Sequence, residues 1–332
     1  MSRDYYIFQN GTLKRKENSL IFKMKSDQKD KKYIPVEDVD NVFCFGSVDL
    51  NKKLLTFLSQ NKISVHFFNY YGFYTGSFYP REVNNSGMLY VEQVKHYTDN
   101  KKRTEIAKKI IDGASFNTYR NVRYYNSRGK DLDEYKEQIS ELRDKLDEQE
   151  SPGQLMGIEG NIKERYYRSF NTIIDQEINF EKRVKRPPDN MINTLISYCN
   201  TLVYTTVLGE IYKTQLSPVV SYLHEPSQSR FSLSLDLAEI FKPLLADRII
   251  FAMFNRNQIT EDDFEEELNF LHLKEKAQKK IVSEYDSTLE RTVKHKNLNR
   301  HVSYKHLIRL ELYKLVKHLM GEKEYKPFKM WW

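Results

Sequence analysis

Residues 5–22 read YYIFQNGTLKRKENSLIF, in which two apolar runs flank the segment Gln9-Asn10-Gly11-Thr12. Asn-Gly between apolar runs is the strongest local signal for a β-hairpin, because both residues tolerate a positive φ. The sequence therefore predicts strands at Tyr5–Phe8 and Ser19–Phe22, with a hairpin turn at Asn10-Gly11.

Further short apolar runs follow at Asp40–Phe45 and Ile63–Phe68. Between them, Asn51–Gln60 carries leucines at helical spacing, which predicts one short helix. Residues 1–85 are therefore expected to form a small β-rich N-terminal domain.

From about residue 90 the apolar residues recur at the spacing of amphipathic helices. Helices are expected at Thr104–Phe116, Leu132–Glu148, Ser151–Phe170, Asn190–Gln215, within 233–256 and at Ser303–Met320. The predicted fold class is α+β, with a larger all-helical C-terminal domain at 101–322. Residues 86–100 are expected to be a linker, and 323–332 a loosely held tail.

The composition limits the class of protein. The 332 residues include 53 basic and 46 acidic side chains, for a net charge of +7. If nucleic acid is the partner, the basic residues must therefore be grouped locally. Cys44 and Cys199 give neither a disulfide framework nor a zinc motif. No signal peptide and no apolar run of about 18 residues is visible, so we expect a cytoplasmic protein.

Glu159 lies on the inward face of the helix expected at Ser151–Phe170. A carboxylate in that position is costly unless it is paired, hydrogen-bonded or bound to a metal. Gly153, Gly157 and Gly160 lie in the same helix, which suggests that another backbone or a ligand approaches it closely. The alternative is an ion pair of Glu159 with Lys163 or Arg165, with glycines for helix packing.

His224 lies where a helix ends and a loop begins, and Asp236 and Glu239 follow twelve and fifteen residues later. Two acids three apart lie on one face of a helix and could act together. The alternative is a capping box, with Asp236 as the N-cap and Glu239 reaching back. For His224 the alternative is an ordinary surface or core histidine.

The segment Lys182–Arg186 carries four basic residues before Pro187-Pro188 and a helix that Asp189 or Asn190 would cap. Basic residues next to a helix N-terminus favour phosphate binding, because the free N–H groups add to the charge. A solvated loop explains the same pattern.

Taken together, these segments resemble the CRISPR-associated integrase/endonuclease family, the Cas-one subunit of spacer acquisition, with a type I-B-like pattern. The matching stretches are Leu155–Gly160 with Arg165-Tyr166, Arg186–Asp189 with Asn193 and Leu195–Tyr198, Pro218 with Leu223–Glu225, and Ser232–Pro243 with Asp247-Arg248. Phe45-Gly46 and Ile63–Phe67 are also similar to the family's N-terminal domain.

The resemblance implies that Glu159, His224 and Glu239 are the catalytic metal ligands, with Asp236 as a supporting residue. Such a donor set favours Mn²⁺ or Mg²⁺. Tyr166 is expected near the DNA strand end. Candidate contacts to the DNA backbone are Arg165, Arg183, Arg186, Arg230, Lys242 and Arg248. The family often has Arg at the position of Lys242, which weakens the expectation of a bidentate phosphate contact there.

The implied activity is metal-dependent: the 3′-hydroxyl of a short DNA fragment attacks a phosphodiester of repeat DNA, and water in its place gives hydrolysis. The implied assembly contains double-stranded DNA, a homodimer of this chain and a small ferredoxin-like partner, with no membrane. Two alternatives stay open at this point. One is a catalytically silent DNA-binding scaffold of the same complex, and the other is a hydrolase of small phosphoesters.

Overall fold

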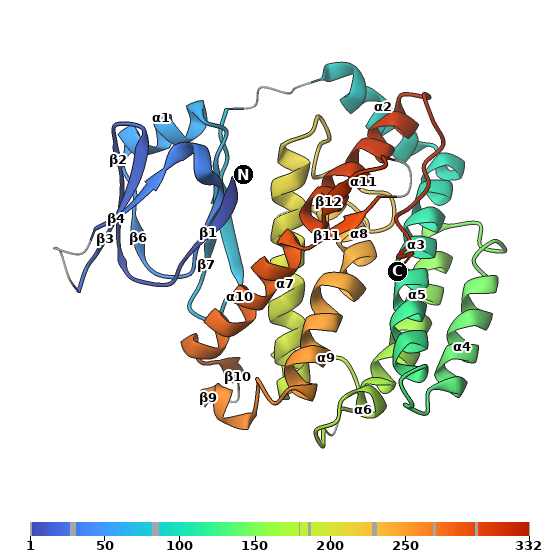
Figure 1. Cartoon of the computed structure of the whole chain (residues 1–332). Helices are drawn as coiled ribbons and strands as arrows, with labels where there is room; N and C mark the ends of the chain where they lie inside the picture. The colour runs from blue at the N-terminus through green and yellow to red at the C-terminus, as the bar shows by residue number, and fades with distance from the viewer. Residues whose placement is uncertain are drawn as a thin grey trace. The chain divides into compact units, whose positions relative to one another are not determined.

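The computed structural model describes residues 2–26, 31–81, 86–178, 180–184, 187–227, 231–267, 270–295 and 298–331. The chain divides into two compact units, and Figure 1 shows their secondary structure. Unit 1 comprises Met1–Asn85 together with Glu275–Asp286. Unit 2 comprises Ser86–Lys274 and Ser287–Trp332. The sequence did not predict that a late helical segment would belong to unit 1.

Unit 1 contains two four-stranded sheets within its described residues, in the orders β1-β5-β7-β8 and β4-β3-β2-β6. The strands are β1 (Arg3–Ile7), β2 (Gly11–Lys16), β3 (Ser19–Met24), β4 (Lys31–Pro35), β5 (Val39–Cys44), β6 (Val48–Asp49), β7 (Ser64–Phe68) and β8 (Tyr74–Phe78). The strands β1, β5 and β7 are parallel, and β8 is antiparallel to β7. The predicted β-rich domain is therefore present.

The predicted hairpin at Asn10-Gly11 is wrong. Strand β1 pairs with β5, and β2 pairs with β3, so the chain crosses from one sheet to the other at these residues. Asn10 uses its side-chain oxygen to accept the backbone N–H of Ser47 at 2.7 Å. Gly11 is required because a Cβ there would lie 2.2 Å from the carbonyl oxygen of Lys23. The glycine marks a close approach of two strands and not a turn.

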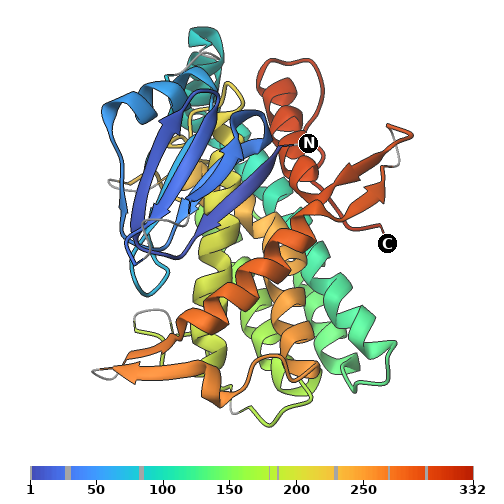
Figure 2. The same ribbon diagram turned by 60° about the vertical axis from the view of Figure 1, so that its left-hand side comes forward.

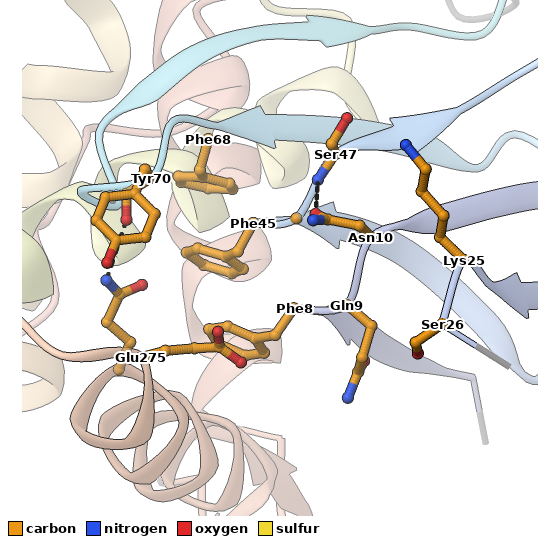
Figure 3. A pocket seen from close by; sticks show the side chains of 12 residues that line it. Phe8, Gln9, Asn10, Lys25, Ser26, Phe45, Ser47, Phe68, Tyr70 and Glu275 are labelled. Atoms are coloured by element: carbon orange, nitrogen blue, oxygen red, sulfur yellow. Dashed lines mark hydrogen bonds between the residues drawn. The ribbon is translucent and has the colours of Figure 1, made fainter.

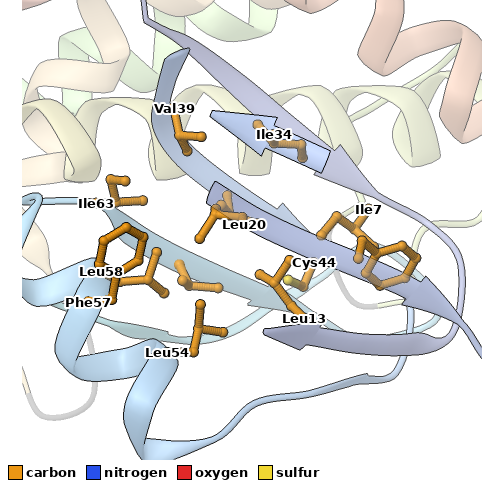
Figure 4. Packing of buried hydrophobic residues seen from close by; sticks show 13 residues of the cluster. Ile7, Leu13, Leu20, Ile34, Val39, Cys44, Leu54, Phe57, Leu58 and Ile63 are labelled. Atoms are coloured by element: carbon orange, nitrogen blue, oxygen red, sulfur yellow. The ribbon is translucent and has the colours of Figure 1, made fainter. Parts of the chain in front are cut away.

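The core of unit 1 contains side chains from both sheets and from helix α1 (Lys52–Gln60), as Figure 4 shows. Leu13, Leu20, Leu54 and Leu58 are all fully buried in this cluster. Asn51 begins α1, because its side chain accepts the backbone N–H of Leu54 at 2.9 Å. The predicted short helix is confirmed.

The carboxyl ends of the parallel strands carry a stack of three phenylalanine rings, visible in Figure 3. Phe45 stacks between Phe8 and Phe68, with ring centroids 4.7 and 4.4 Å apart. These rings line a pocket of about 800 Å³ that also includes Lys25 and the start of helix α10 (Glu275–Glu290). The pocket lies within unit 1, because every residue that lines it belongs to that unit.

Unit 2 is mainly helical, which confirms the predicted α+β fold class, but it is not all-helical, because it also contains two short hairpins. Its helices are α2 (Gly87–Thr98), α3 (Asn100–Asn126), α4 (Asp133–Asp144), α5 (Pro152–Arg168), α6 (Phe170–Ile173), α7 (Met191–Tyr212), α8 (Ser232–Lys242), α9 (Arg248–Asn255) and α11 (Tyr304–Leu319). Two hairpins are added, β9 (Phe264–Glu267) with β10 (Phe270–Leu273) and β11 (Thr292–Lys294) with β12 (His301–Ser303). Figure 2 shows these hairpins in orange and red. The expected linker at 86–100 is largely helix α2, inside unit 2.

The expected loose tail is packed into unit 2. Tyr325, Phe328 and Met330 are each at most 4% exposed. The buried carboxylate of Glu311 on α11 accepts the hydroxyl of Tyr325 at 2.7 Å and the backbone N–H of Phe328 at 2.9 Å. Phe328 also stacks on Phe241 of α8. The tail therefore supports the helix that carries Glu239.

No helix among the described residues is long and apolar enough to cross a membrane.

Candidate metal centre

Glu159 lies in the middle of α5. Ser151 caps this helix by accepting the backbone N–H of Gln154, and Pro152 occupies its first turn, as the sequence predicts. The side chain of Glu159 is 19% exposed. No other backbone of the described residues approaches the glycines, because a Cβ at Gly153, Gly157 or Gly160 would have no neighbouring atom within 4 Å. These positions are open, and the approach of a ligand stays a prediction.

Glu239 lies on α8, which packs against α3 and α7 (Figure 1). Its carboxylate is only 6% exposed and contacts the ammonium groups of two lysines. Lys163 Nζ is 2.8 Å from Glu239 Oε2, and Lys242 Nζ is 2.6 Å from Glu239 Oε1. Lys163 also forms an ion pair with Glu159, one turn earlier on α5. One ammonium group therefore bridges the two predicted metal-binding carboxylates.

The electrostatics of this cluster favour the charged forms. Burial opposes the charge on Glu239, but Lys163 and Lys242 outweigh it and lower the pKa of the carboxyl. Burial likewise opposes the charge on Lys163, and Glu239 and Glu159 raise the pKa of its ammonium group well above the usual range. Glu239 and Lys163 are thus both ionised near neutral pH.

Asp236 supports the loop that carries His224, and the capping-box alternative is wrong. Helix α8 begins at Ser232 without a side-chain cap, so Asp236 lies inside the helix. Its fully buried carboxylate accepts the backbone N–H groups of Tyr222, Leu223 and His224 at 2.7, 2.9 and 2.9 Å. It also contacts Nδ1 of His224 at 2.8 Å.

The contact between Asp236 and His224 fixes the role of each imidazole nitrogen. A carboxylate can only accept, so Nδ1 carries the proton and Nε2 keeps the lone pair when the ring is neutral. An imidazole that ligates a metal has the same arrangement, with its other nitrogen donating to a carboxylate.

The three predicted ligands do not form one cluster. Within the described ranges, no three His, Cys, Asp or Glu side chains converge closely enough to hold a metal ion. Glu159 and Glu239 meet through Lys163, whereas His224 is bonded to Asp236. The alternative of a Glu159–Lys163 ion pair is therefore present in the structure. The donor set nevertheless fits a hard divalent cation, because two carboxylates already share one positive charge.

A buried polar network lies beside these carboxylates. Tyr166 is 2% exposed and its hydroxyl accepts a hydrogen bond from Asn121 at 2.9 Å, so the side chain is buried in the protein, and its place near a DNA strand end stays a prediction. Burial raises the pKa of Asp247 to about 7, although a hydrogen bond with Tyr166 opposes the shift. Asp247 belongs to the π-helical turn Pro243–Asp247, a type of turn frequent at functional sites. Asn121 was not predicted, because no local pattern in α3 marks it.

A small cavity of about 30 Å³ is lined both by the carboxylate cluster and by the buried polar network of Tyr166 and Asp247. Glu159, Lys163, Glu239 and Asp247 are among the residues that line it. The side-chain oxygen of Asn200, another lining residue, is buried and has no hydrogen-bond partner within the described residues. An acceptor of this kind suits a water molecule held beside the carboxylates.

Comparison with known proteins identifies the family. The family model described as CRISPR associated protein Cas1 matches residues 5–287. The chain belongs to the Cas1 family. A CRISPR-associated endonuclease Cas1 from Fusobacterium nucleatum is 58% identical over 332 residues, which cover 100% of this chain and 98% of the relative.

Solved structures agree with this assignment. A Cas1 protein from Thermotoga maritima has a TM-score of 0.87 and 42% identity, with 97% of this chain and 99% of that chain covered. A casposase bound to integration product also has a TM-score of 0.87, at 22% identity and with 98% and 93% covered, and shows the fold alone.

The predicted DNA contacts of this Cas1 chain differ in their surroundings. Arg165 is 35% exposed and pairs with its neighbour Glu164. Arg183 donates to the oxygens of Val184, Asn193 and Ser197, so its guanidinium group holds the loop.

Two further candidates already have protein partners. Lys242 is paired with Glu239, and Arg248 donates to the side-chain oxygen of Asn121 at 2.8 Å. Arg186 and Arg230 lie outside the described residues.

Proposed function

We propose that this Cas1 chain is a metal-dependent DNA endonuclease and integrase of CRISPR adaptation. The observation that carries the proposal is the pair of carboxylates of Glu159 and Glu239, which share one cation in a chain whose relatives are named Cas1 endonucleases. Its substrates are duplex DNA with a free 3′-hydroxyl and repeat DNA. The proposed assembly is a homodimer with a small ferredoxin-like partner. The subtype stays a prediction.

Glu159, Glu239 and Nε2 of His224 would hold Mn²⁺ or Mg²⁺. When bound, the ion supplies Lewis-acid stabilisation of charge on the phosphodiester oxygens. Asp236 orients His224 by holding three backbone N–H groups and Nδ1. Because His224 lies outside the carboxylate cluster, the proposal requires the side chains of Glu159 and Glu239 to rearrange toward His224 when the ion binds, while Asp236 keeps its hold on the loop.

The test uses the purified chain with its partner, short duplexes, a repeat-bearing plasmid and Mn²⁺. Glu159→Ala, His224→Ala and Glu239→Ala should each abolish joining and hydrolysis, while duplex binding stays within a few fold of the wild type. Glu164→Ala is the matched control, because Glu164 lies on the same helix and pairs with Arg168 at 2.6 Å. This control should keep its activity.

Joined product from any of the three variants would remove that residue from the site. Duplex binding without metal-dependent product in the wild type would favour the alternative of a catalytically silent scaffold.

A further inference from the structure

Lys163 has a contact pattern that the proposed chemistry leaves unexplained. Its ammonium group lies between Glu159 and Glu239, the position that a divalent ion would have to share. Lys242 contacts the same cluster only through Oε1 of Glu239. We propose that Lys163 is a tethered cation, which neutralises the two carboxylates in the metal-free protein and must leave when the divalent ion binds. This inference rests on the proposed function.

The charge of the cluster supports displacement. Two carboxylates and two ammonium groups sum to zero, so the metal-free cluster is neutral although Glu239 is only 6% exposed. A divalent ion added to all four groups would leave two uncompensated positive charges in a partly buried site, which is costly. One lysine therefore has to withdraw.

Lys163 is the lysine with a route to solvent. Its side chain is 34% exposed, whereas that of Lys242 is 17% exposed. Gly160, three residues earlier, lies on the same face of α5 and leaves open space beside it. Lys163 can therefore leave by a rotation of its own side chain, without a change in the helix.

The first test is isothermal titration calorimetry with Mn²⁺ alone on the full chain. Lys163→Met should bind Mn²⁺ about fivefold more tightly than the wild type, because the ion no longer competes with an ammonium group. A change of about fivefold is the upper size of a single charged contact after screening at a partly exposed site. Without metal, the same variant should melt at a lower temperature. Arg168→Met is the matched control, because it removes a cation that pairs with Glu164 on the outer face of α5. Its affinity for Mn²⁺ should equal that of the wild type.

A second measurement needs no variant. Amine acetylation followed by mass spectrometry should modify Lys163 of the wild-type protein several-fold faster in saturating Mn²⁺ than in EDTA. Lys314 is the internal control, because it is 37% exposed and also pairs with a buried acid, Glu311, at 2.7 Å. Its rate should not change.

The outcomes separate the two proposals. Equal or weaker Mn²⁺ binding by Lys163→Met, or unchanged Lys163 acetylation in the presence of bound Mn²⁺, overturns the tethered cation and leaves the metal site intact. Absence of Mn²⁺ binding in both the wild type and Lys163→Met, or binding that survives Glu159→Gln and Glu239→Gln, overturns the metal site itself. Mn²⁺ binding that is detected in Lys163→Met but not in the wild type supports both the metal site and the tethered cation.

Discussion

Replacement of Asp236 tests whether one buried carboxylate holds the His224 loop in place. In Asp236→Ala, three backbone N–H groups and the N–H of the imidazole lose their acceptor inside unit 2. A buried donor left without a partner costs about 1–3 kcal/mol, and such costs are not fully additive. We therefore expect a loss of about 3–5 kcal/mol in the free energy of unfolding.

The arrangement of the acceptors gives a graded comparison. Oδ2 accepts the backbone N–H groups of Tyr222 and Leu223. Oδ1 accepts the backbone N–H of His224 and the Nδ1–H of its imidazole. Asp236→Asn keeps one oxygen and can satisfy only one of these two pairs, so it should lose about half as much as Asp236→Ala. Asp144→Ala is the control, because Asp144 is exposed at the end of α4 in the same unit.

Urea unfolding followed by tryptophan fluorescence measures this loss in unit 2. The chain has two tryptophans, Trp331 and Trp332, and both belong to that unit. The measurement is made in EDTA so that metal binding does not contribute. If Asp236→Ala unfolds within about 0.5 kcal/mol of the wild type, as expected of ordinary surface substitutions, the four hydrogen bonds do not support the loop as argued.

Three further substitutions test the buried support of the site and an open position on α5. Burial raises the pKa of Asp247 from 3.8 to about 7, so the folded chain holds a proton that the unfolded chain releases between about pH 4 and 7. Unfolding free energy should therefore fall as pH rises through that window, by up to about 4 kcal/mol, and Asp247→Asn should remove the fall in urea titrations at pH 5 to 8 in EDTA. A Cβ at Gly113 would lie 2.7 Å from Cβ of Pro327, so Gly113→Val should detach the tail, cost about 2 kcal/mol or more and expose residues 325–331 to proteolysis. Gly153→Ala, whose Cβ meets no atom within 4 Å, should instead be neutral or stabilising by up to about 1 kcal/mol.

The regular elements could be predicted from the sequence because their signals are local. Ser303 caps α11 through the N–H of His306, and Gly321 follows the helix with a φ of 73°, as the pattern Ser303–Gly321 indicates. The prediction of a hairpin at Asn10-Gly11 was wrong because the contacts that decide the structure there are not local. Both residues make contacts with segments distant in the chain, Ser47 and Lys23, and the same dipeptide suits such a contact as well as a turn.

The tail was mispredicted because its partners are single polar groups buried in distant helices. Asn117 of α3 accepts the N–H of Met330 at 2.8 Å and donates to Ile240 of α8 at 2.9 Å. Neither Asn117 nor Glu311 changes the apolar periodicity of its helix. The sequence therefore does not mark either residue as a partner of the tail. Short aromatic segments without a period, such as Tyr325–Met330, therefore look like loose ends in the sequence.

The spacing along α5 correctly placed Glu159 on the inward face of its helix, but it could not decide between an ion pair and a metal site. The structure shows why these two interpretations are compatible. A small domain with a structural zinc site is unfolded without metal, because metal binding supplies its free energy of folding. Here Lys163 and Lys242 neutralise the acids, so unit 2 can fold before any metal arrives. The same lysines then oppose metal binding, and the affinity for the ion depends on how easily Lys163 leaves.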